Sequence, residues 1–233
     1  MPHHTVRYIL SLLLFLLLTP AHAGVVINGT RIIYPANERE ITVQITNDGK
    51  KPVLIQSWLD IGDKNSAPDT IKTPFILTPP INRLDAGKAQ SLRIISTTTS
   101  ALPQDRESLF WLNVLEIPSR PKGEMTDANY LQFAIRSRLK FFWRPEALKK
   151  TAAMAPHSLT WKLSAQGMTI GNPSPHYISL YRVSIDGKKV NVDMLPPFGN
   201  LTVDDIKTAH GKTVKAEWID DYGAIRKKDF TVD

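Results

Sequence analysis

The sequence predicts an all-β protein that is built from two immunoglobulin-like sandwich domains in tandem. Apolar and polar residues alternate with a period of two, as in Glu40 to Thr46, where Ile41, Val43 and Ile45 share one face. Turn-forming residues such as Asn47-Asp48-Gly49 separate these segments. The chain also divides into two halves of about 100 residues, the usual size of such a sandwich.

The composition fits a globular chain and excludes several other classes. The 233 residues are 42% hydrophobic and 8% aromatic, with 12 Gly, 17 Pro and no Cys. These proportions exclude collagen-like, disulfide-stapled and low-complexity proteins. The formal net charge is +7, but no basic-aromatic platform with the spacing of a nucleic-acid-binding module occurs, so nucleic acid is not an expected partner.

The N-terminus carries the features of a secretory signal peptide. Two histidines and Arg7 precede an uncharged run from Tyr8 to Leu18, which is followed by Pro20 and the small-residue site Ala21-His22-Ala23. A transmembrane anchor is the weaker interpretation, because a spanning helix needs roughly 20 apolar residues. We therefore expect residues 1–23 to be a signal peptide, and the rest of the chain to be exported without membrane insertion.

In the first half, six segments show strand-like alternation between connections that contain proline, such as Thr78-Pro79-Pro80. In chain order, the predicted strands are Val25 to Tyr34, Glu40 to Thr46, Val53 to Leu59, Gln90 to Ile95, Ser108 to Glu116 and Tyr130 to Phe142.

The alternation lapses from Glu146 to Pro156 (EALKKTAAMAP) and then resumes. We interpret residues 147–156 as a linker between a first domain at 24–146 and a second at 157–233. The strands predicted for the second domain are Leu159 to Leu163, Met168 to Ile170, Tyr177 to Ile185, Leu201 to Val203, Val214 to Ile219 and Phe230 to Val232.

Catalytic and metal-binding motifs are missing from the sequence. His157, His176 and His210 have no Cys, His or carboxylate at metal-ligand spacing. There is no G-x-S-x-G elbow, Gly-rich phosphate loop, H-E-x-x-H motif or cysteine nucleophile. The pair Asp220-Asp221 is ill placed for a hydrolase, because adjacent strand residues point to opposite faces. The sequence therefore predicts no enzyme, no metal and no cofactor.

The segment from Tyr130 to Pro145 has two chemically different faces. Its apolar face carries Leu131, Phe133 and Ile135, and its basic face carries Arg136, Arg138 and Lys140. Periodicity alone favours an ordinary core strand with a solvated basic face. A functional assignment therefore needs further information.

Motifs in both halves resemble those of the PapD-like family of periplasmic pilus chaperones. The most specific is the L-P-x-D-R-E-S block from Leu102, which continues as far as Pro118. A strand that ends in Lys140-Phe-Phe-Trp-Arg-Pro145 follows it, as in the family. Further matches, which extend the resemblance over nearly the whole exported chain, are Thr78-Pro79-Pro80 with Arg83-Leu84, Gly171-Asn-Pro-Ser-Pro175 and Asp220-Asp-Tyr-Gly223.

The resemblance implies a non-enzymatic chaperone of pilus subunits, with its two domains set at an angle. Pilins of this class resemble a sandwich that lacks its last strand, and the chaperone lends one by β-augmentation. Leu131, Phe133 and Ile135 match the donor residues by position. The implied partners are fimbrial subunits and an outer-membrane usher, and the implied location is the periplasm. Self-association of the unbound protein is left open.

The resemblance also assigns Arg31 and Lys140 to the C-terminal carboxylate of the bound subunit. Two cations beside one carboxylate make charge-assisted bonds, which would fix the register of the donated strand. Strict alternation, however, places Lys140 on the face opposite Phe133 and Ile135. A bulge or a strong twist between Ile135 and Lys140 would reconcile the two assignments.

Two further sets of residues follow from the resemblance alone. The family's buried ionic triad, which is thought to set the angle between the domains, is matched by Glu107, Arg144 and Asp221. Positions of usher contact are matched by Pro79, Pro80 and Arg93, although two prolines also suit a stiff turn.

The resemblance also bears on loop length and on cysteines. The connection from Ile117 to Asn129 is short, which is similar to the branch that serves assembled pilus rods rather than thin fibres. Several relatives have a cysteine pair in their last strands, and this chain has none. Its second domain is therefore expected to be stable through packing alone.

A rival interpretation is an exported sandwich protein that binds carbohydrate or matrix through its loops. A solitary sandwich would place Phe133 in its own core, whereas a chaperone would present Phe133 outward to a subunit.

Overall fold

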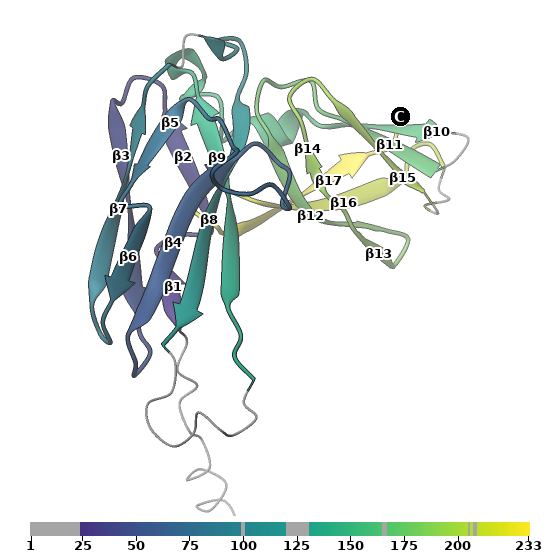
Figure 1. Cartoon of the computed structure of the whole chain (residues 1–233). Coiled ribbons are helices and arrows are strands. Elements are labelled where there is room, and N and C mark those ends of the chain that lie inside the picture. The colour runs from purple at the N-terminus through teal and green to yellow at the C-terminus, as the bar shows by residue number, and fades with distance from the viewer. Residues whose placement is uncertain (1–23, 99–100, 120–130, 165–166, 205, 207–208) are drawn as a thin grey trace, which may run out of the picture.

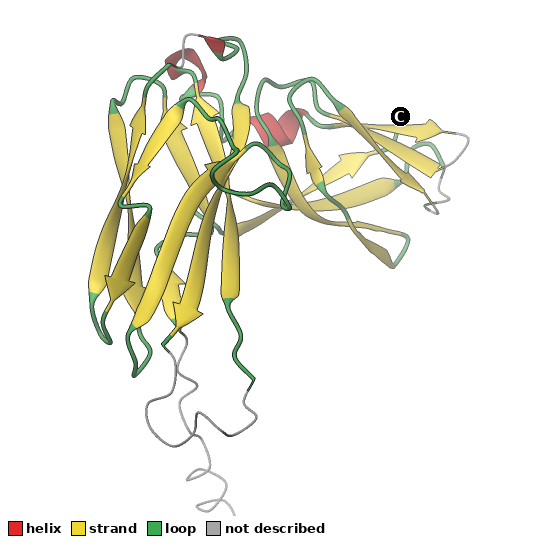
Figure 2. Cartoon of the chain, in the orientation of Figure 1, coloured by secondary structure: helices red, strands yellow, loops and turns green. Residues whose placement is uncertain are grey.

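The computed structural model describes residues 24–98, 101–119, 131–164, 167–204, 206 and 209–233. These residues form two β-sandwiches that lie at an angle to each other (Figure 1). Strands joined by loops make up nearly all of both, with only short helical turns (Figure 2). The predicted all-β, two-sandwich class is confirmed. The predicted signal peptide and most of the connection from Ile117 to Asn129 lie outside the described residues.

The described residues of the first domain form nine strands. They are β1 (Val25–Ile27), β2 (Arg31–Pro35), β3 (Glu40–Asn47), β4 (Val53–Asp60), β5 (Phe75–Thr78), β6 (Ile81–Leu84), β7 (Ala89–Ser96), β8 (Ser108–Pro118) and β9 (Ile135–Arg144). One sheet has the strand order β1-β3-β7-β5, and the facing sheet has the order β2-β9-β8-β4-β6. All pairs are antiparallel except β2 with β9, which is parallel.

The first predicted strand, Val25 to Tyr34, is wrong as a single element. The chain crosses here from one sheet to the other, because β1 pairs with β3 whereas β2 pairs with β9. Gly29 lies at the crossing with a φ of 111°, a conformation that residues with a Cβ rarely adopt. Apolar residues on both sides of the crossing concealed it in the sequence pattern.

Other differences concern short strands and strand ends. The sequence analysis treated the region around Pro79 and Pro80 as a connection, but β5 and β6 flank it as short edge strands. In the predicted strand Tyr130 to Phe142, the observed β9 begins only at Ile135. Short edge strands bury few residues, so they show little of the alternation that reveals longer ones.

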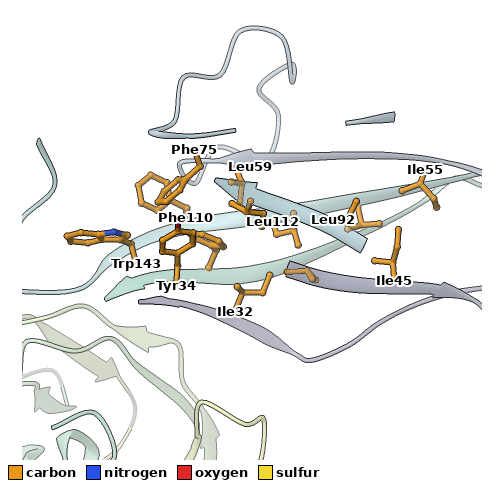
Figure 3. Packing of buried hydrophobic residues seen from close by; sticks show 14 of the residues in the cluster. Ile32, Tyr34, Ile45, Ile55, Leu59, Phe75, Leu92, Phe110, Leu112 and Trp143 are labelled. Atoms are coloured by element: carbon orange, nitrogen blue, oxygen red, sulfur yellow. The ribbon is translucent and has the colours of Figure 1, made fainter. Parts of the chain in front are cut away.

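The core of the first domain holds β9 in place through aromatic packing. Figure 3 shows Tyr34, Phe75, Phe110 and Trp143 among the buried side chains of this core. Phe141 of β9 meets Phe75 at a centroid distance of 5.0 Å and Tyr34 at 5.7 Å. Such pairs contribute about 0.5–1.5 kcal/mol each beyond their buried area. The C-terminal half of β9 is thus firmly part of the core.

The second domain follows two 3-10 helices, η3 (Glu146–Leu148) and η4 (Ala155–Ser158), and its described part contains eight strands. Its sheets have the orders β10-β11-β15 and β13-β12-β16-β17, with β14 beside β12. Trp161, Met168 and Ile170 lie in its core with at most 1% exposure. The strands are β10 (Thr160–Ser164), β11 (Gly167–Gly171), β12 (Ile178–Ile185), β13 (Lys188–Asn191), β14 (Met194–Leu195), β15 (Asn200–Asp204), β16 (Thr213–Ile219) and β17 (Ile225–Thr231).

The predicted strands of the second half are broadly right, with two omissions and one wrong boundary. The strands β13 and β14 were missed, and β17 begins at Ile225 rather than at Phe230. Only two residues of β17, Lys228 and Phe230, are partly buried, so most of this edge strand lacks an apolar face. Within the described ranges, no helix is long and apolar enough to cross a membrane.

Candidate functional site

One half of β9 has a free edge. Strand β8 pairs with β9 from Ile135 to Trp143, but β2 pairs with it only from Lys140 to Arg144. Within the described residues, Ile135 to Leu139 therefore have a strand neighbour on one side only. The backbone groups that point to the other side are available to a further strand.

Three large apolar side chains lie in or next to this free half. Leu131, Phe133 and Ile135 are 78%, 68% and 60% exposed, respectively. On the same face further along β9, Phe141 and Trp143 are buried to 0% and 1% exposure. The interpretation of Phe133 as a core residue is therefore wrong: this face passes from solvent into the core along its length.

The opposite face of β9 carries Lys140, as alternation predicted. Lys140 is the register partner of Trp111 on β8 and of Arg31 on β2, and Trp111 in turn faces Asp60 on β4. The register between β8 and β9 runs without interruption from Ser108 to Glu116, so the described strand contains no bulge. Of the two explanations offered for the opposed faces, only the twist of the strand remains.

Arg31 and Lys140 lie side by side where the free edge begins, and both reach toward the second domain. The Arg31 Nη1 donates to the carbonyl oxygen of Ile219 at 2.9 Å, and the Lys140 Nζ lies 3.5 Å from the Ser179 Oγ. Neither cation has a carboxylate within 4 Å among the described residues. The Arg31 Nε is buried without a hydrogen-bond partner there.

The surroundings of the two cations make their charges costly. Burial lowers the pKa of Arg31, although Asp221 and Asp220 oppose this effect. Burial likewise lowers the pKa of Lys140, Asp193 opposes the shift, and the neighbouring charge of Arg31 adds to it. A bound anion would offset both the desolvation of the two charges and their mutual repulsion.

An ionic network joins the two domains next to this pair. The Arg144 Nε donates to the Glu107 Oε1 at 2.6 Å, and its two Nη atoms donate to the Asp221 carboxylate at 2.7 and 3.0 Å. Burial alone would lower the pKa of Arg144, but its bonds to Asp221 and Glu107 outweigh burial and raise it. Glu107 and Arg144 are buried, whereas the Asp221 side chain is 38% exposed.

His176 also belongs to this network, and sequence reasoning missed it. Its Nδ1 lies 3.0 Å from the Glu107 Oε1, and its Nε2 lies 2.9 Å from the Thr151 hydroxyl. The backbone N–H of Tyr177 donates to the Glu107 Oε2 at 2.8 Å. A first-domain carboxylate thus holds the start of β12 in the second domain. A search for metal-ligand spacing could not reveal a histidine with this role.

Comparison with known proteins agrees with this geometry. A family model described as "Pili and flagellar-assembly chaperone, PapD N-terminal domain" matches residues 24–149, and "Pili assembly chaperone PapD, C-terminal domain" matches residues 154–230. The chain belongs to the PapD family of pilus-assembly chaperones.

Individual relatives support the same assignment. Chaperone protein MrkB of Klebsiella pneumoniae is 42% identical over 210 residues, which cover 88% of this chain and 90% of that protein. The crystal structure of the Pseudomonas aeruginosa CupB2 chaperone has a TM-score of 0.77 at 35% identity, and covers 89% of this chain and 100% of that one. A structure of the Salmonella enterica SafA pilin in complex with the SafB chaperone has a TM-score of 0.78 at 28% identity, covering 91% and 98%.

The residues that the resemblance linked to the usher lie away from β9, around β5 and β7 of this fimbrial chaperone's first domain. Pro79 and Pro80 follow β5, and Arg93 on β7 is the register partner of Thr78. Arg93 also forms an ion pair with Glu40, and both side chains are exposed. The structure thus brings Pro79 and Arg93 to one end of the β5-β7 pair.

Asp220 and Asp221 each have their own arginine in the chaperone. They lie in the turn after β16 rather than in a strand, which corrects the sequence-based placement. Asp221 binds Arg144, and Asp220 binds Arg226 at 2.7 Å. A cavity of about 380 Å³ borders both carboxylates. Within the described ranges, no group of three or more His, Cys, Asp or Glu could hold a metal ion.

Proposed function

We propose that this chain is a periplasmic chaperone that captures fimbrial subunits by donor-strand complementation and delivers them to an outer-membrane usher. The observation that carries the proposal is the free edge of β9, which ends at two cations without a carboxylate partner among the described residues. The periplasmic location rests on the signal peptide expected at residues 1–23.

The direction of the sheet explains why a carboxylate would reach these cations. Strand β2 is parallel to β9 and occupies its edge from Lys140 onward. A subunit strand that adds below β2 in the same direction would have its C-terminal end at Lys140 and Arg31. Its terminal carboxylate would then replace the missing counter-charge through charge-assisted hydrogen bonds.

The exposed apolar side chains supply the second part of the interaction. In β-augmentation, main-chain hydrogen bonds provide affinity and alternate side chains fill pockets of the partner. Leu131, Phe133 and Ile135 are spaced for this purpose and are largely exposed. A pilin that lacks its last strand would offer the matching groove.

Subunit capture tests the proposal. A major fimbrial subunit of the source organism is co-expressed in the periplasm with the tagged full chain and recovered on the tag. Arg31→Ala and Lys140→Ala each remove a charged hydrogen bond worth about 1.5–3 kcal/mol, so capture should fall roughly 10- to 100-fold. Extending the subunit by one residue moves the terminal carboxylate, and a compensating one-residue slip would turn every side chain to the opposite face, so this extension should have the same effect.

Arg83→Ala is the matched control, because Arg83 is an exposed cation on β6 at the far edge of the same sheet. Capture by this variant should equal that of the wild type. Undiminished capture by either Arg31→Ala or Lys140→Ala would refute the carboxylate anchor. Delivery is tested in the same way: a fragment of the usher that is co-expressed with the tagged full chain and the subunit should be recovered on the tag.

A further inference from the structure

Lys140 is one of three cations at two-residue spacing on one face of β9, together with Arg136 and Arg138. A bound strand that slips by two residues keeps its side chains on the same faces, because the side-chain period is two. The apolar residues of β9 therefore do not by themselves exclude such a slip. After it, the terminal carboxylate would lie at Arg138 instead of Lys140.

Arg138 already has a carboxylate partner. Its Nε donates to the Asp60 Oδ2 at 3.1 Å, and its Nη2 donates to the Asp60 Oδ1 at 2.6 Å and to the Gly62 carbonyl at 2.8 Å. The guanidinium also lies over the ring of Trp111, 4.3 Å from its centre. This combination of a bidentate carboxylate and an aromatic face is one that arginine fits well.

The Asp60 carboxylate is held in place by further hydrogen bonds. It is 2% exposed and accepts further hydrogen bonds from the Asn113 Nδ2 at 2.7 Å and from the Gly62 N–H at 2.6 Å. Asp60 and Lys140 occupy the same row of the sheet, but Trp111 stands between them. The carboxylate therefore neutralises Arg138, whereas Lys140 has no carboxylate within 4 Å among the described residues.

Arg136 is a weaker competitor. Its Nη1 donates to the carbonyl oxygen of Lys64 at 2.8 Å. A carboxylate would reach it only after a slip of four residues, which gives up more of the backbone pairing along the free edge.

We propose that Asp60 determines the register of the bound subunit, because it occupies Arg138 and so leaves Lys140 and Arg31 as the anchor for the terminal carboxylate. This inference rests on the proposed function. It assigns a specificity role to a residue of β4 that need not touch the subunit.

The register can be read by disulfide cross-linking, since the chain has no cysteine of its own. Ser137→Cys on β9 is paired with single cysteines in the last strand of the co-expressed subunit, either at the position expected opposite residue 137 or two residues nearer the C-terminus. The wild-type background should give only the first product. Asp60→Asn should give at least a tenfold increase in the second.

A double variant sharpens the test. Lys140→Ala alone should lose capture. The double variant Asp60→Asn with Lys140→Ala should capture at least tenfold more subunit than Lys140→Ala does, in the shifted register and with the carboxylate bound to Arg138. Asp60→Asn with Arg138→Ala should return to the unshifted product only. Asp85→Asn, which removes an exposed carboxylate from Arg83 on the far side of the sheet, is the control and should change nothing.

The results separate this inference from the proposed function. If Lys140→Ala captures subunits as well as the wild type, the carboxylate anchor itself is wrong. If Lys140→Ala loses capture but neither Asp60 variant yields a shifted product, only the register role of Asp60 is overturned. Should Asp60→Asn fail to fold, the double variant Asp60→Asn with Arg138→Lys keeps a competing cation at position 138 on a flexible stem that can reach solvent. The absence of a shifted product in that variant overturns the inference equally.

Discussion

Asp60 and Glu107 are buried carboxylates that each hold an arginine of β9, and each makes that arginine unavailable for another role. Asp60 holds Arg138 within the first domain, whereas Glu107 holds Arg144 at the boundary with the second. Both have the additional hydrogen bonds that a buried charge requires if it is to be tolerated. The adjacent and partly buried cations Arg31 and Lys140, by contrast, have no carboxylate within 4 Å among the described residues, and this difference marks the candidate site.

The ion pair of Asp60 predicts a specific dependence of stability on pH. Burial alone would raise the pKa of Asp60, but hydrogen bonds from Arg138, Asn113 and Gly62 outweigh it and keep the pKa below its ordinary value of 3.8. A carboxyl with a depressed pKa in the folded state stabilises the fold above its unfolded pKa, and this contribution is lost as the pH falls through the folded pKa.

Asp60→Asn should therefore be less stable than the wild type at pH 7, by about 1–3 kcal/mol. The difference should shrink below pH 4 and vanish at the lowest pH at which the chain still folds. Urea unfolding of both proteins from pH 7 to pH 2 measures it. A constant difference over this range would show that Asp60 does not titrate as an ion-paired carboxylate.

At the scale of the element, the two halves of β9 differ in their pairing and in their exposure. Its C-terminal half has strand neighbours on both sides and carries the core residues Phe141 and Trp143. Its N-terminal half has one neighbour and carries exposed apolar residues. The half that is paired on both sides thus holds the free half in place, and the exposed apolar residues of the free half are not part of the domain's own core.

Two phenylalanines on the same face of this segment provide a matched test. Phe133→Ser should leave the free energy of unfolding within about 0.5 kcal/mol of the wild type, because Phe133 is 68% exposed. Phe141→Ser should cost about 3–5 kcal/mol, because it removes a fully buried ring. Thermal unfolding and subunit capture are measured together: Phe133→Ser should lose capture without losing stability. A large loss of stability in Phe133→Ser would mean that this ring packs in the domain after all.

At the scale of the whole molecule, the joint between the domains places the second domain beside the cations Arg31 and Lys140. Glu107 contacts His176 and Tyr177 of the second domain, and its backbone N–H donates to the carbonyl of Pro175 at 3.0 Å. Because Ile219 and Ser179 contact Arg31 and Lys140, the same joint sets the surroundings of the site.

Calorimetric unfolding tests this coupling. Glu107→Ala leaves the Arg144 guanidinium buried with one carboxylate fewer, so it should cost about 3–5 kcal/mol and split the unfolding of the two domains into separate transitions. Asp221→Ala should cost less, about 1–2 kcal/mol, because Asp221 is 38% exposed. Equal losses, or a single transition in Glu107→Ala, would show that Glu107 does not couple the domains.

The sequence by itself determined the class of the fold and the chemistry of the two faces of the segment from Tyr130 to Pro145. These properties are local: alternation assigns Phe133 and Lys140 to opposite faces whatever the strand packs against. The resemblance to pilus chaperones then singled out Arg31, which no spacing in the sequence distinguishes.

Only the tertiary structure decided where β9 is left unpaired and which charges are already satisfied. Asp60 and Arg138 are 78 residues apart, and Glu107 and His176 are 69 apart, so no local pattern connects them. The crossing at Gly29, which ends the cover of β9 at Lys140, likewise depends on pairing between distant strands. Faces follow from the geometry of one strand, whereas free edges and free charges depend on every neighbour that the folded chain brings to them.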